Sequence, residues 1–375
     1  MNKAYRYRIY PTKGQQRLLN QMLEECRWLY NRTLGYRIYA YEQEERTADW
    51  YETKRLIPVY KKTIRPTLSK VYSQVLQNVT ERVDLAFKAF FRRLKSGETP
   101  GFPRFKGKGR YDSITYTQTG FKVEGEWLDL SKVGRLWVVL HRPIEGKIKT
   151  LTIRRSSTNK WYASFSCEVE PNILPLTDKV VGVDVGLDFF ATLSTGEHVA
   201  NPRFFRTEEK KLASVQRRLS KEEKETPQRA KRRKPVSRVH ERIRWKREDF
   251  IHKLSRRLIN EFGLIAFEDL NILAMIRNHC LAKSIADAAW NQLVQFTSSK
   301  AEEAGRRVVL VDPRNTSKMC SRCGVLVEKK LSDRMHYCAC GLSINRDLNA
   351  SFNVLRLGLQ ASGIQPVKAL TTDLR

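Results

Sequence analysis

The sequence has no long apolar run. None of its apolar stretches approaches the roughly 20 residues that a membrane-spanning helix requires. Its opening residues, MNKAYRYRIYPT, lack the apolar segment of a signal peptide. Internal repeats and extended low-complexity segments are also missing. We therefore expect a soluble intracellular protein without a membrane partner, and 375 residues allow two or three domains.

Acidic residues are scarce relative to basic ones. Forty Asp and Glu stand against 70 Lys and Arg, which gives a net charge of +30 and a pI near 10.0. Such a surface attracts polyanions from a distance. There are two weaker interpretations. One is a soluble protein whose basic charge has no functional role, and the other is a protein that binds an anionic membrane surface. Nucleic acid is the expected partner.

Basic residues are densest between positions 229 and 247, where ten of 19 residues are Lys or Arg. We expect this cluster to hold RNA or heteroduplex phosphates, with a tryptophan available for stacking; the alternative is a solvated charged helix. The expected contacts are Arg229, Lys231, Arg232, Arg233, Lys234, Arg242, Arg244 and Trp245.

Cysteines are few and unevenly placed. Three of the seven are isolated and fit plain buried thiols, whereas four lie within 21 residues as Cys320-Ser-Arg-Cys323 and Cys338-Ala-Cys340. Two such pairs, 14 residues apart, predict one tetrahedral Zn²⁺ site that is structural because all four positions are filled. His336 in place of one thiolate, or a redox disulfide pair, are the alternatives.

The first half of the chain predicts a small β-barrel interrupted by helices. Residues 3–10 alternate as a strand, and helical spacing follows over 15–39 and about 68–94. Glycine and proline break the pattern at 97–110. Short β-like runs then occupy 113–117, 136–141, 149–155 and 161–169, and we expect the first strand to join them.

The second half predicts alternating strands and helices. Strands are expected at 180–185, 189–193, 264–267 and 307–311, with a helix at 284–303. The charged stretch EEKETPQRAKRRKP at 222–235 reads as an exposed connection.

Three acidic residues end or begin these elements. Asp184 lies in the apolar strand GVDVG, Glu268 ends the apolar strand LIAFE, and Asp347 lies in the first turn of a helix. Singly, such residues are commonly turn formers or favourable dipole partners. Together, strand, strand and helix carboxylates form the layout of an RNase H-like nuclease centre. Hydrolysis of a phosphodiester there uses two Mg²⁺ ions roughly 3.5–4 Å apart, and carboxylates are the ligands such cations prefer.

Six motifs, in order, resemble one family. They are YRYRIYPTKGQ at 5–15, GFPRFK at 101–106, GVDVG at 182–186, FEDL at 267–270, TSKMCSRCG at 316–324 and NRDLNAS at 345–351. The sequence resembles TnpB, the accessory protein of insertion sequences and ancestor of single-protein type V CRISPR effectors. The resemblance implies an RNA-guided DNA endonuclease that supports transposon maintenance in a bacterial or archaeal cytoplasm, associated with the nucleoid.

The resemblance also implies an architecture: an RNase H-like (RuvC) α/β domain with a zinc-ribbon insertion, preceded by a wedge β-barrel that a helical recognition lobe interrupts. The expected boundaries are 1–11 for the first barrel strand, 12–96 for the lobe and 97–176 for the rest of the barrel. RuvC would follow at 177–311 and 344–358, with the zinc-binding insertion at 312–343 and a loosely held tail at 359–375.

Further site residues are implied by the same resemblance. The intact Asp184, Glu268 and Asp347 take the catalytic places, which relatives repurposed as repressors have lost. Tyr51, Gln77 and Thr117 fall where family members contact the DNA duplex of the adjacent motif. Ser73 stands where a related protein has lysine, so we expect this chain to recognise a different adjacent motif.

The implied partners are a guide RNA from the transposon end and double-stranded target DNA with its adjacent motif. Three other functions compete with this interpretation. They are a transposase that performs strand transfer itself, a nuclease-dead RNA-guided binder and a plain RNA-binding protein.

Overall fold

The computed structural model describes residues 1–330 and 333–363. The chain divides into two compact units, Met1–Val169 and Glu170–Arg375. Within the described ranges, no helix is long and apolar enough to cross a membrane.

The first unit contains a seven-stranded antiparallel sheet in the order β2-β6-β7-β1-β5-β4-β3. Its strands are β1 (Asn2–Tyr10), β2 (Ser113–Tyr116), β3 (Phe121–Glu124), β4 (Trp127–Leu130), β5 (Gly134–Val139), β6 (Lys147–Arg155) and β7 (Trp161–Glu168). Tyr116 of one edge strand lies 6.4 Å from Phe121 of the other, ring centroid to ring centroid, so the sheet is nearly closed.

The predicted joining of the first strand to the later ones is confirmed, because β1 pairs with both β5 and β7. Alternation along β1 buries Tyr5, Tyr7 and Ile9 inside the curled sheet and turns its arginines outward. The short strands β3 and β4 were not predicted, since neither is long enough to show a clear period.

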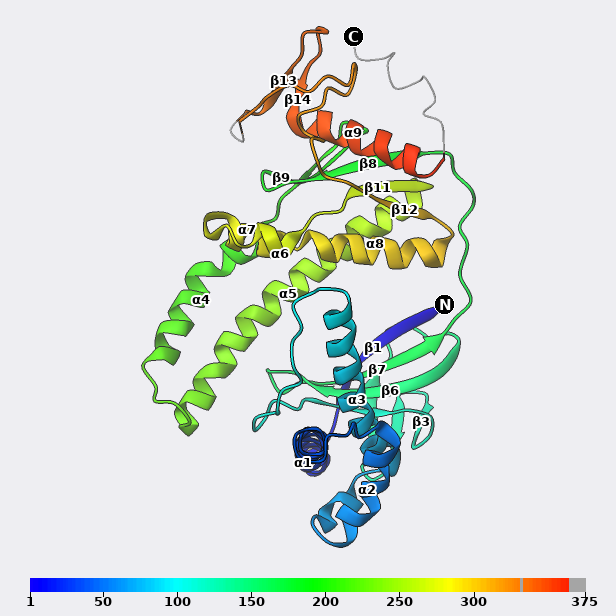
Figure 1. Ribbon diagram of the computed structural model, residues 1–375, viewed down its shortest axis with the longest axis vertical. Helices are drawn as coiled ribbons and strands as arrows, with labels where there is room; N and C mark the ends of the chain where they lie inside the picture. The colour runs from blue at the N-terminus through cyan, green and yellow to red at the C-terminus, as the bar shows by residue number, and fades with distance from the viewer. Residues whose placement is uncertain (331–332, 364–375) are drawn as a thin grey trace. The chain divides into compact units, whose positions relative to one another are not determined.

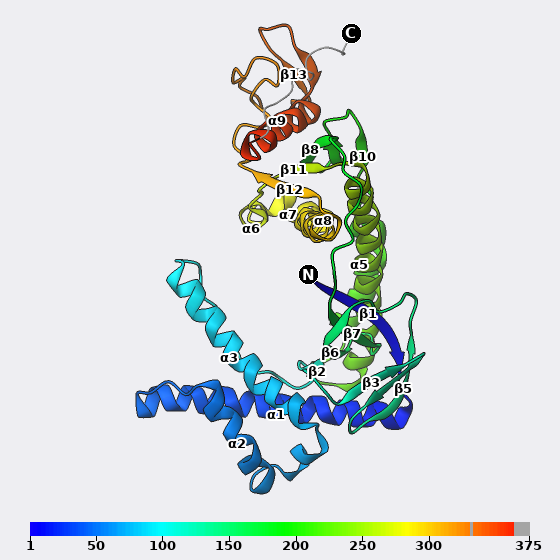
Figure 2. The same cartoon turned by 90° about the vertical axis from the view of Figure 1, so that its right-hand side faces the viewer.

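In the chain order, helices lie between β1 and β2 (Figure 2). They are α1 (Lys13–Glu44), α2 (Trp50–Lys62), the 3₁₀ turn η1 (Pro66–Lys70) and α3 (Ser73–Lys95). Thr12 and Gln15 form a capping box that starts α1. A buried ion pair of 2.8 Å between Arg37 and Asp84 ties α1 to α3. The two long helices were predicted, whereas α2 was not.

The second unit contains a five-stranded sheet in the order β10-β9-β8-β11-β12. Its strands are β8 (Val180–Val185), β9 (Phe189–Leu193), β10 (His198–Ala200), β11 (Leu264–Glu268) and β12 (Arg307–Val311). The neighbours β8, β11 and β12 run parallel, and β9 and β10 run antiparallel. This parallel centre with an antiparallel edge agrees with the expected RNase H-like arrangement.

Helices cover both faces of this sheet (Figure 1). One apolar core joins Val181 and Val183 to side chains of α5 (Pro227–Glu261) and α8 (Trp290–Ala304). On the other face, α9 (Arg346–Ala361) packs directly on the strands. A Cβ at Gly182 would lie only 2.2 Å from the carbonyl oxygen of Ser351, so glycine permits this close approach.

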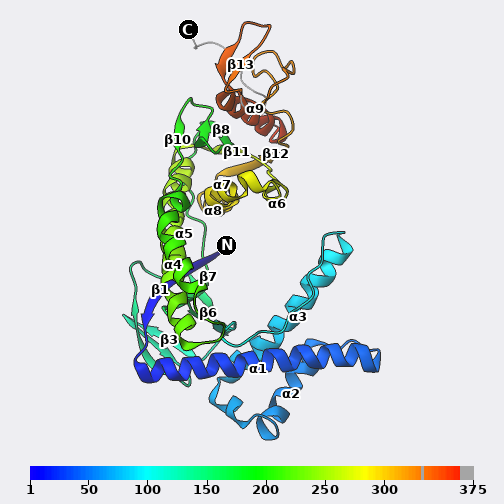
Figure 3. The same cartoon turned by 90° about the vertical axis from the view of Figure 1, so that its left-hand side faces the viewer.

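The predicted connection at 222–235 is partly wrong. The structure forms α4 (Phe204–Ser220) and α5 as neighbouring helices (Figure 3), and α5 begins at Pro227 and continues through Pro235. A proline inside a helix removes one backbone hydrogen bond. Burial of Leu212 from α4 against Val239 and Ile243 from α5 offsets that loss.

The predicted helix at 284–303 is also two helices. α7 (His279–Ala288) and α8 are separated at Ala289, whose φ of 56° lies in the left-handed region. A short helix α6 (Ile272–Met275) precedes them. The predicted tail at 359–375 starts within α9, and from residue 364 it lies outside the described residues.

Candidate active site and metal centre

The sheet places two of the three predicted acids side by side. β8 and β11 are parallel neighbours whose register pairs Val183 with Phe267, and Asp184 and Glu268 each follow by one residue. Because side chains alternate between faces, Asp184 shares the face of Gly182, which contacts α9. Glu268 shares the face of Ala266, which also contacts α9. Both carboxylates therefore project toward α9.

The third acid comes from the start of α9. The side chain of Asn345 accepts hydrogen bonds from the backbone N–H groups of Asp347 (2.8 Å) and Leu348 (3.2 Å) and so caps the helix. This cap holds Asp347 in the first turn, 15% exposed, with Arg346 Nε 3.2 Å from its Oδ1.

The charges of the three acids act on one another. The pKa of Asp184 is raised well above its ordinary value, first by burial and then by the negative charges of Glu268 and Asp347, while Arg346 partly offsets the effect. Burial also raises the pKa of Glu268, against the lowering influence of a hydrogen bond from Thr316. The structure thus brings the three predicted residues into one electrostatic site.

These carboxylates fit a hard cation. Half-buried acids of like charge are costly without a counterion, and oxygen ligands are those that Mg²⁺ prefers. As they stand, the three acids are not a group of three ligand atoms close enough together for a single ion. Among the described residues, the four clustered cysteines are the one group of His, Cys, Asp or Glu whose ligand atoms all lie within 4.8 Å of one another.

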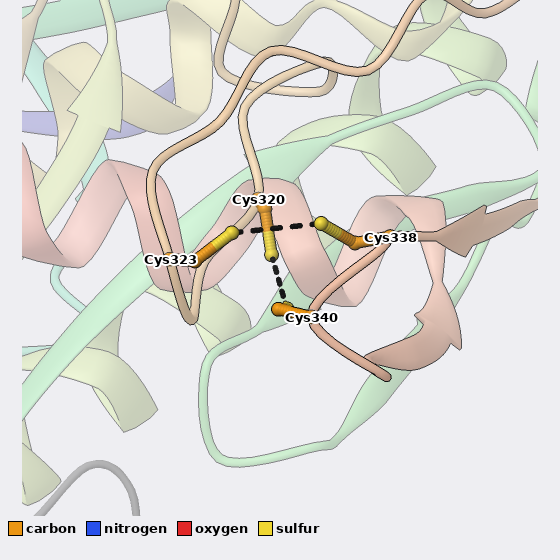
Figure 4. A group of neighbouring side chains, drawn as sticks. All are labelled: Cys320, Cys323, Cys338 and Cys340. Carbon is orange, nitrogen blue, oxygen red and sulfur yellow. Dashed lines mark hydrogen bonds between the residues drawn. The ribbon is translucent and has the colours of Figure 1, made fainter.

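The four predicted zinc ligands do come together (Figure 4). Cys320 Sγ lies 3.6 Å from Cys340 Sγ, and Cys323 Sγ lies 3.5 Å from Cys338 Sγ. Sulfurs bound to zinc at about 2.3 Å in a tetrahedron are roughly 3.8 Å apart, whereas a disulfide bond is about 2.05 Å. The arrangement therefore fits a metal site and not a disulfide pair.

His336 is not one of the grouped ligands. It is fully buried on β13 (Met335–Tyr337), which pairs with β14 (Ser343–Asn345), and its Nδ1 faces the amine of Lys329. Burial alone would raise the pKa of the Cys320 thiol, but the backbone N–H groups of Cys323 and Arg322 lower it to about 6. A thiol of low pKa is ready to bind metal as thiolate.

Two buried asparagines, which were not among the predicted site residues, connect the cysteine loop to α9. Asn349 Nδ2 donates to Met319 O at 2.7 Å and its Oδ1 accepts from Ser321 N at 2.9 Å. Asn353 Nδ2 donates to Met319 O and to Thr316 O. Their signal was present, because both interrupt the apolar face of an amphipathic helix at a spacing of four residues.

Thr316 was missed as well. Its hydroxyl donates a 2.6 Å hydrogen bond to Glu268 Oε1, and its side chain is buried. It therefore orients one of the three carboxylates from the segment that leads to Cys320.

The residues implied for the adjacent motif lie around the first half of α3. Tyr51 on α2 is 62% exposed, and α2 is joined to α3 by a hydrogen bond from Trp50 Nε1 to Thr80 Oγ1. Gln77 is a partly exposed residue of α3. Thr117 directly follows β2, in a turn whose backbone donates to Gln74 Oε1 on α3. The three positions remain predicted contacts.

The basic cluster lies along α5, and part of it is used within the chain. Arg229 donates to the backbone oxygens of Leu219, in the last turn of α4, and of Glu222, just beyond that helix. Ion pairs join Arg232 to Glu222, Arg242 to Glu208 and Arg244 to Glu248. Lys231, Arg233 and Lys234 are exposed, and Trp245 is 39% exposed. These residues remain predicted contacts, of which the exposed lysines and arginine have the most freedom to bind phosphate.

Three family models match the sequence. A model described as "Probable transposase" (OrfB_IS605) matches residues 164–279, and one described as "Cas12f1-like, TNB domain" matches 290–354. A third, described as a helix-turn-helix domain, matches 1–46. Those 46 residues, all within the described range, form strand β1 and the single helix α1, so no helix-turn-helix occurs there.

Curated relatives cover nearly the whole chain. A "Putative RNA-guided DNA endonuclease" of Streptomyces pristinaespiralis is 35% identical over 98% of this chain and 92% of its own length. The "Putative RNA-guided DNA endonuclease InsQ" of Escherichia coli K12 is 28% identical over 95% and 92%. The "TnpB-like protein L79" of Acanthamoeba polyphaga mimivirus is 24% identical over 94% and 72%.

A solved structure shares the fold. The protein in a cryo-EM structure of a Cas12f1–sgRNA–target DNA complex aligns with a TM-score of 0.57 and 15% identity, covering 92% of this chain and 83% of that one.

Proposed function

Because this chain belongs to the TnpB family, we propose that it is an RNA-guided DNA endonuclease that cleaves double-stranded DNA beside a short adjacent motif. The reaction is phosphodiester hydrolysis. The observation that carries the proposal is the grouping of Asp184, Glu268 and Asp347, in which burial and the charges of Glu268 and Asp347 raise the pKa of Asp184. Its biological role is maintenance of a transposon in a bacterial or archaeal cell, at the nucleoid.

In this proposal the three carboxylates hold Mg²⁺, with two ions as the expected number. Two ions are proposed because the three acids do not form a single close ligand group and because phosphodiester hydrolysis commonly uses a pair of ions roughly 3.5–4 Å apart. Bound Mg²⁺ would supply activation of water and stabilisation of charge on the phosphate and the leaving oxygen.

The protein's own part is to hold these carboxylates in place. Asp184 is fixed by its strand, Glu268 by its strand and by the hydroxyl of Thr316, and Asp347 by the cap at Asn345. All three come from elements that pack into apolar cores of the second unit. Such rigid support keeps the site preorganised.

The cysteine site serves as a structural Zn²⁺ site in the same proposal. Four thiolates leave no open coordination position for chemistry. The hydrogen bonds of Asn349 and Asn353 fix this loop against α9, the helix that carries Asp347, so an ordered loop helps to hold that helix in place.

Sequence selection comes from base pairing in a guide RNA derived from the transposon end. A net charge of +30 provides backbone affinity, which by itself is independent of sequence. Guide pairing then selects the target, while the protein checks a short flanking motif. Tyr51, Gln77 and Thr117 are proposed for that check.

Exchange of the guide tests the function. Purified protein with each of two guide RNAs is given Mg²⁺ and a plasmid library with a randomised flank. Cut sites should move to match each guide while the required flanking motif stays constant. Cut sites that remain unchanged after the exchange, or that appear equally without RNA, would contradict the proposal.

The match to a "Probable transposase" model favours a second candidate, strand transfer by the protein itself. RNase H-like centres support that chemistry as well. The two functions separate when transposon-end DNA is incubated with RNA-free protein and Mg²⁺, because only a transposase joins the ends under those conditions. The presence of all three acids argues against a nuclease-dead binder.

A further inference from the structure

The loop with the sequence GFPRFK (101–106) is held rigidly although it has no regular secondary structure. Asn31 of α1 donates from Nδ2 to Lys106 O at 3.0 Å and accepts from Lys106 N at 2.7 Å. Arg27 of α1 donates to the same carbonyl oxygen at 3.2 Å. Paired bonds of this kind fix the backbone of the loop against α1.

This loop completes an aromatic cluster at the C-terminal half of α3. Phe102 meets Phe87 and Phe90 edge-on, with ring centroids 5.7 and 5.4 Å apart. Phe91 stacks beside Phe87 at 6.4 Å. Phe91 is nevertheless 48% exposed and Phe102 is 50% exposed, so both present fixed ring surface to solvent. The exposed surfaces of these rings therefore take no part in packing the protein's own core.

Basic residues accompany these rings on α3 and along the loop. Lys88, Phe91, Arg92 and Lys95 recur at helical spacing on one face of α3 and, with Ser96, line an open depression. Between residues 88 and 110 there are eight Lys or Arg and one acid, Glu98. Among described residues no ion pair engages Arg92, Lys95 or Arg104, whereas Lys88 pairs with Asp84.

We propose that this aromatic–basic patch (Lys88, Phe91, Arg92, Lys95, Phe102 and Arg104) binds an unpaired polynucleotide strand. Exposed rings offer stacking to bases, and neighbouring cations follow the phosphates, which is the common design of single-strand binding surfaces. Bases within a duplex are already stacked on each other and do not need such rings. The excess of eight Lys or Arg over one acid between residues 88 and 110 favours a polyanion over a protein occupant.

Two sources supply a strand of this chemistry if the proposed function holds. One is an unpaired segment of the guide RNA, and the other is the DNA strand that guide pairing displaces. The inference rests on the proposed function only for this choice of source, since the patch itself is defined by its side chains.

The test measures binding of the full-length protein to fluorescent single-stranded RNA, single-stranded DNA and a blunt duplex of equal length, over a range of salt. The charge variant combines Arg92→Gln, Lys95→Gln and Arg104→Gln. Its matched control removes the same charge from exposed positions elsewhere in the first unit, as Lys13→Gln, Arg17→Gln and Lys70→Gln. A third variant, Phe91→Leu with Phe102→Leu, keeps apolar packing but removes the rings.

The charge variant should reduce the slope of log affinity against log salt by about 2 for single strands, since each lost phosphate contact contributes about 0.7. The ring variant should weaken single-strand binding roughly 5-fold or more with the slope unchanged. If only binding to single-stranded RNA is weakened, the guide RNA is the source. If binding to single-stranded RNA and to single-stranded DNA is weakened alike, either source fits the patch.

Equal losses in the patch and control charge variants, or losses on the duplex as large as on single strands, would overturn the inference. So would ring variants that bind as wild type, which is the result expected if the patch serves an acidic protein. Guided cleavage is assayed in parallel. If wild-type protein shows guided cleavage and the patch variants bind single strands as wild type does, only this inference is overturned. If the patch variants lose single-strand binding but wild-type protein shows no guided cleavage, only the proposed function is overturned.

Discussion

Thr316 Oγ1 lies 2.6 Å from Glu268 Oε1, across 48 residues of sequence. The threonine leads to the cysteine loop, and the glutamate ends a central strand of the sheet. This single hydrogen bond therefore connects the candidate metal centre to the candidate active site.

Thr316→Val should reduce cleavage about 10- to 100-fold, the usual cost of removing a partner that orients a metal ligand. Burial raises the pKa of Glu268, and loss of the hydroxyl removes an influence that lowers it, so Mg²⁺ should bind more weakly. The measurement is cleavage rate against Mg²⁺ concentration. Thr316→Ser keeps the donor and should restore the wild-type Mg²⁺ dependence. A valine variant with an unchanged Mg²⁺ requirement would show that Thr316 is structural only.

Asp184→Ala, Glu268→Gln and Asp347→Ala should each lower cleavage by roughly a thousandfold or more, because bound ions stabilise the transition state by several kcal/mol. Guide-RNA binding should stay nearly intact. The double variants should be no worse than the single ones, since the residues act as a unit. Asp178→Asn, an exposed acid of the same unit, is the control. Appreciable cutting by Glu268→Gln protein would remove Glu268 from the centre.

Asp184→Asn should stabilise the protein when Mg²⁺ is chelated. The folded-state pKa of Asp184 is raised, so the folded protein holds this proton more tightly than the unfolded chain does. Stability from this group is present at low pH and is lost as pH rises from its unfolded pKa, about 3.9, through the folded value. At pH 7.5 asparagine removes the cost of the ionised group, so thermal unfolding in EDTA should shift upward by a few degrees.

The gain should shrink toward pH 4, where the carboxyl is protonated in both states. Added Mg²⁺ should raise the unfolding temperature of the wild type and have less effect on the variant. Asp178→Asn should leave the unfolding temperature unchanged at both pH values. An Asp184→Asn protein that unfolds at a lower temperature than wild type in EDTA would falsify the electrostatic account.

Cys320→Ser or Cys338→Ser should lose about one equivalent of zinc per chain, measured by elemental analysis. Because structural zinc contributes local folding energy, hydrogen exchange should become faster across residues 312–345 of the described part. Cleavage should fall too, since Asn349 and Asn353 join this loop to the helix that carries Asp347. Cys280→Ser on α7 is the matched control. Of the three isolated cysteines predicted to be buried, Cys26 and Cys167 are buried, but Cys280 is exposed, so the prediction is wrong there. Purified wild-type protein without zinc and with four alkylatable thiols would contradict the site.

Gln77→Ala or Tyr51→Ala should change which flanking motifs support cleavage and leave the guide-matched positions unaffected. Sequencing of the products from a library with a randomised flank measures both properties at once. Glu42→Ala, at an exposed residue of α1, should keep the wild-type motif. The same motif profile in all three variants would mean that neither residue reads the flank.

Local chemistry was enough to predict several features from sequence. Alternation predicted β1, because burial of one strand face imposes a period of two. Continuous apolar runs predicted the central strands β8 and β11, which are covered on both faces. The two cysteine pairs predicted their meeting, because each pair is close in sequence and its spacing forms the turn that directs both thiols inward. Asp184, Glu268 and Asp347 were predicted because each ends or begins an apolar element, where a carboxylate is conspicuous.

Other features were decided only by contacts between distant segments. Nothing near Thr316 in sequence indicates that its hydroxyl meets Glu268, and the roles of Asn349 and Asn353 depend on backbone oxygens 30 or more residues away. The continuation of α5 through Pro235 follows from packing against α4, which outweighs a local helix-breaking preference. The period and spacing of residues indicate which side of a segment is exposed to water. The residues that pack against its buried side are determined only by the tertiary structure.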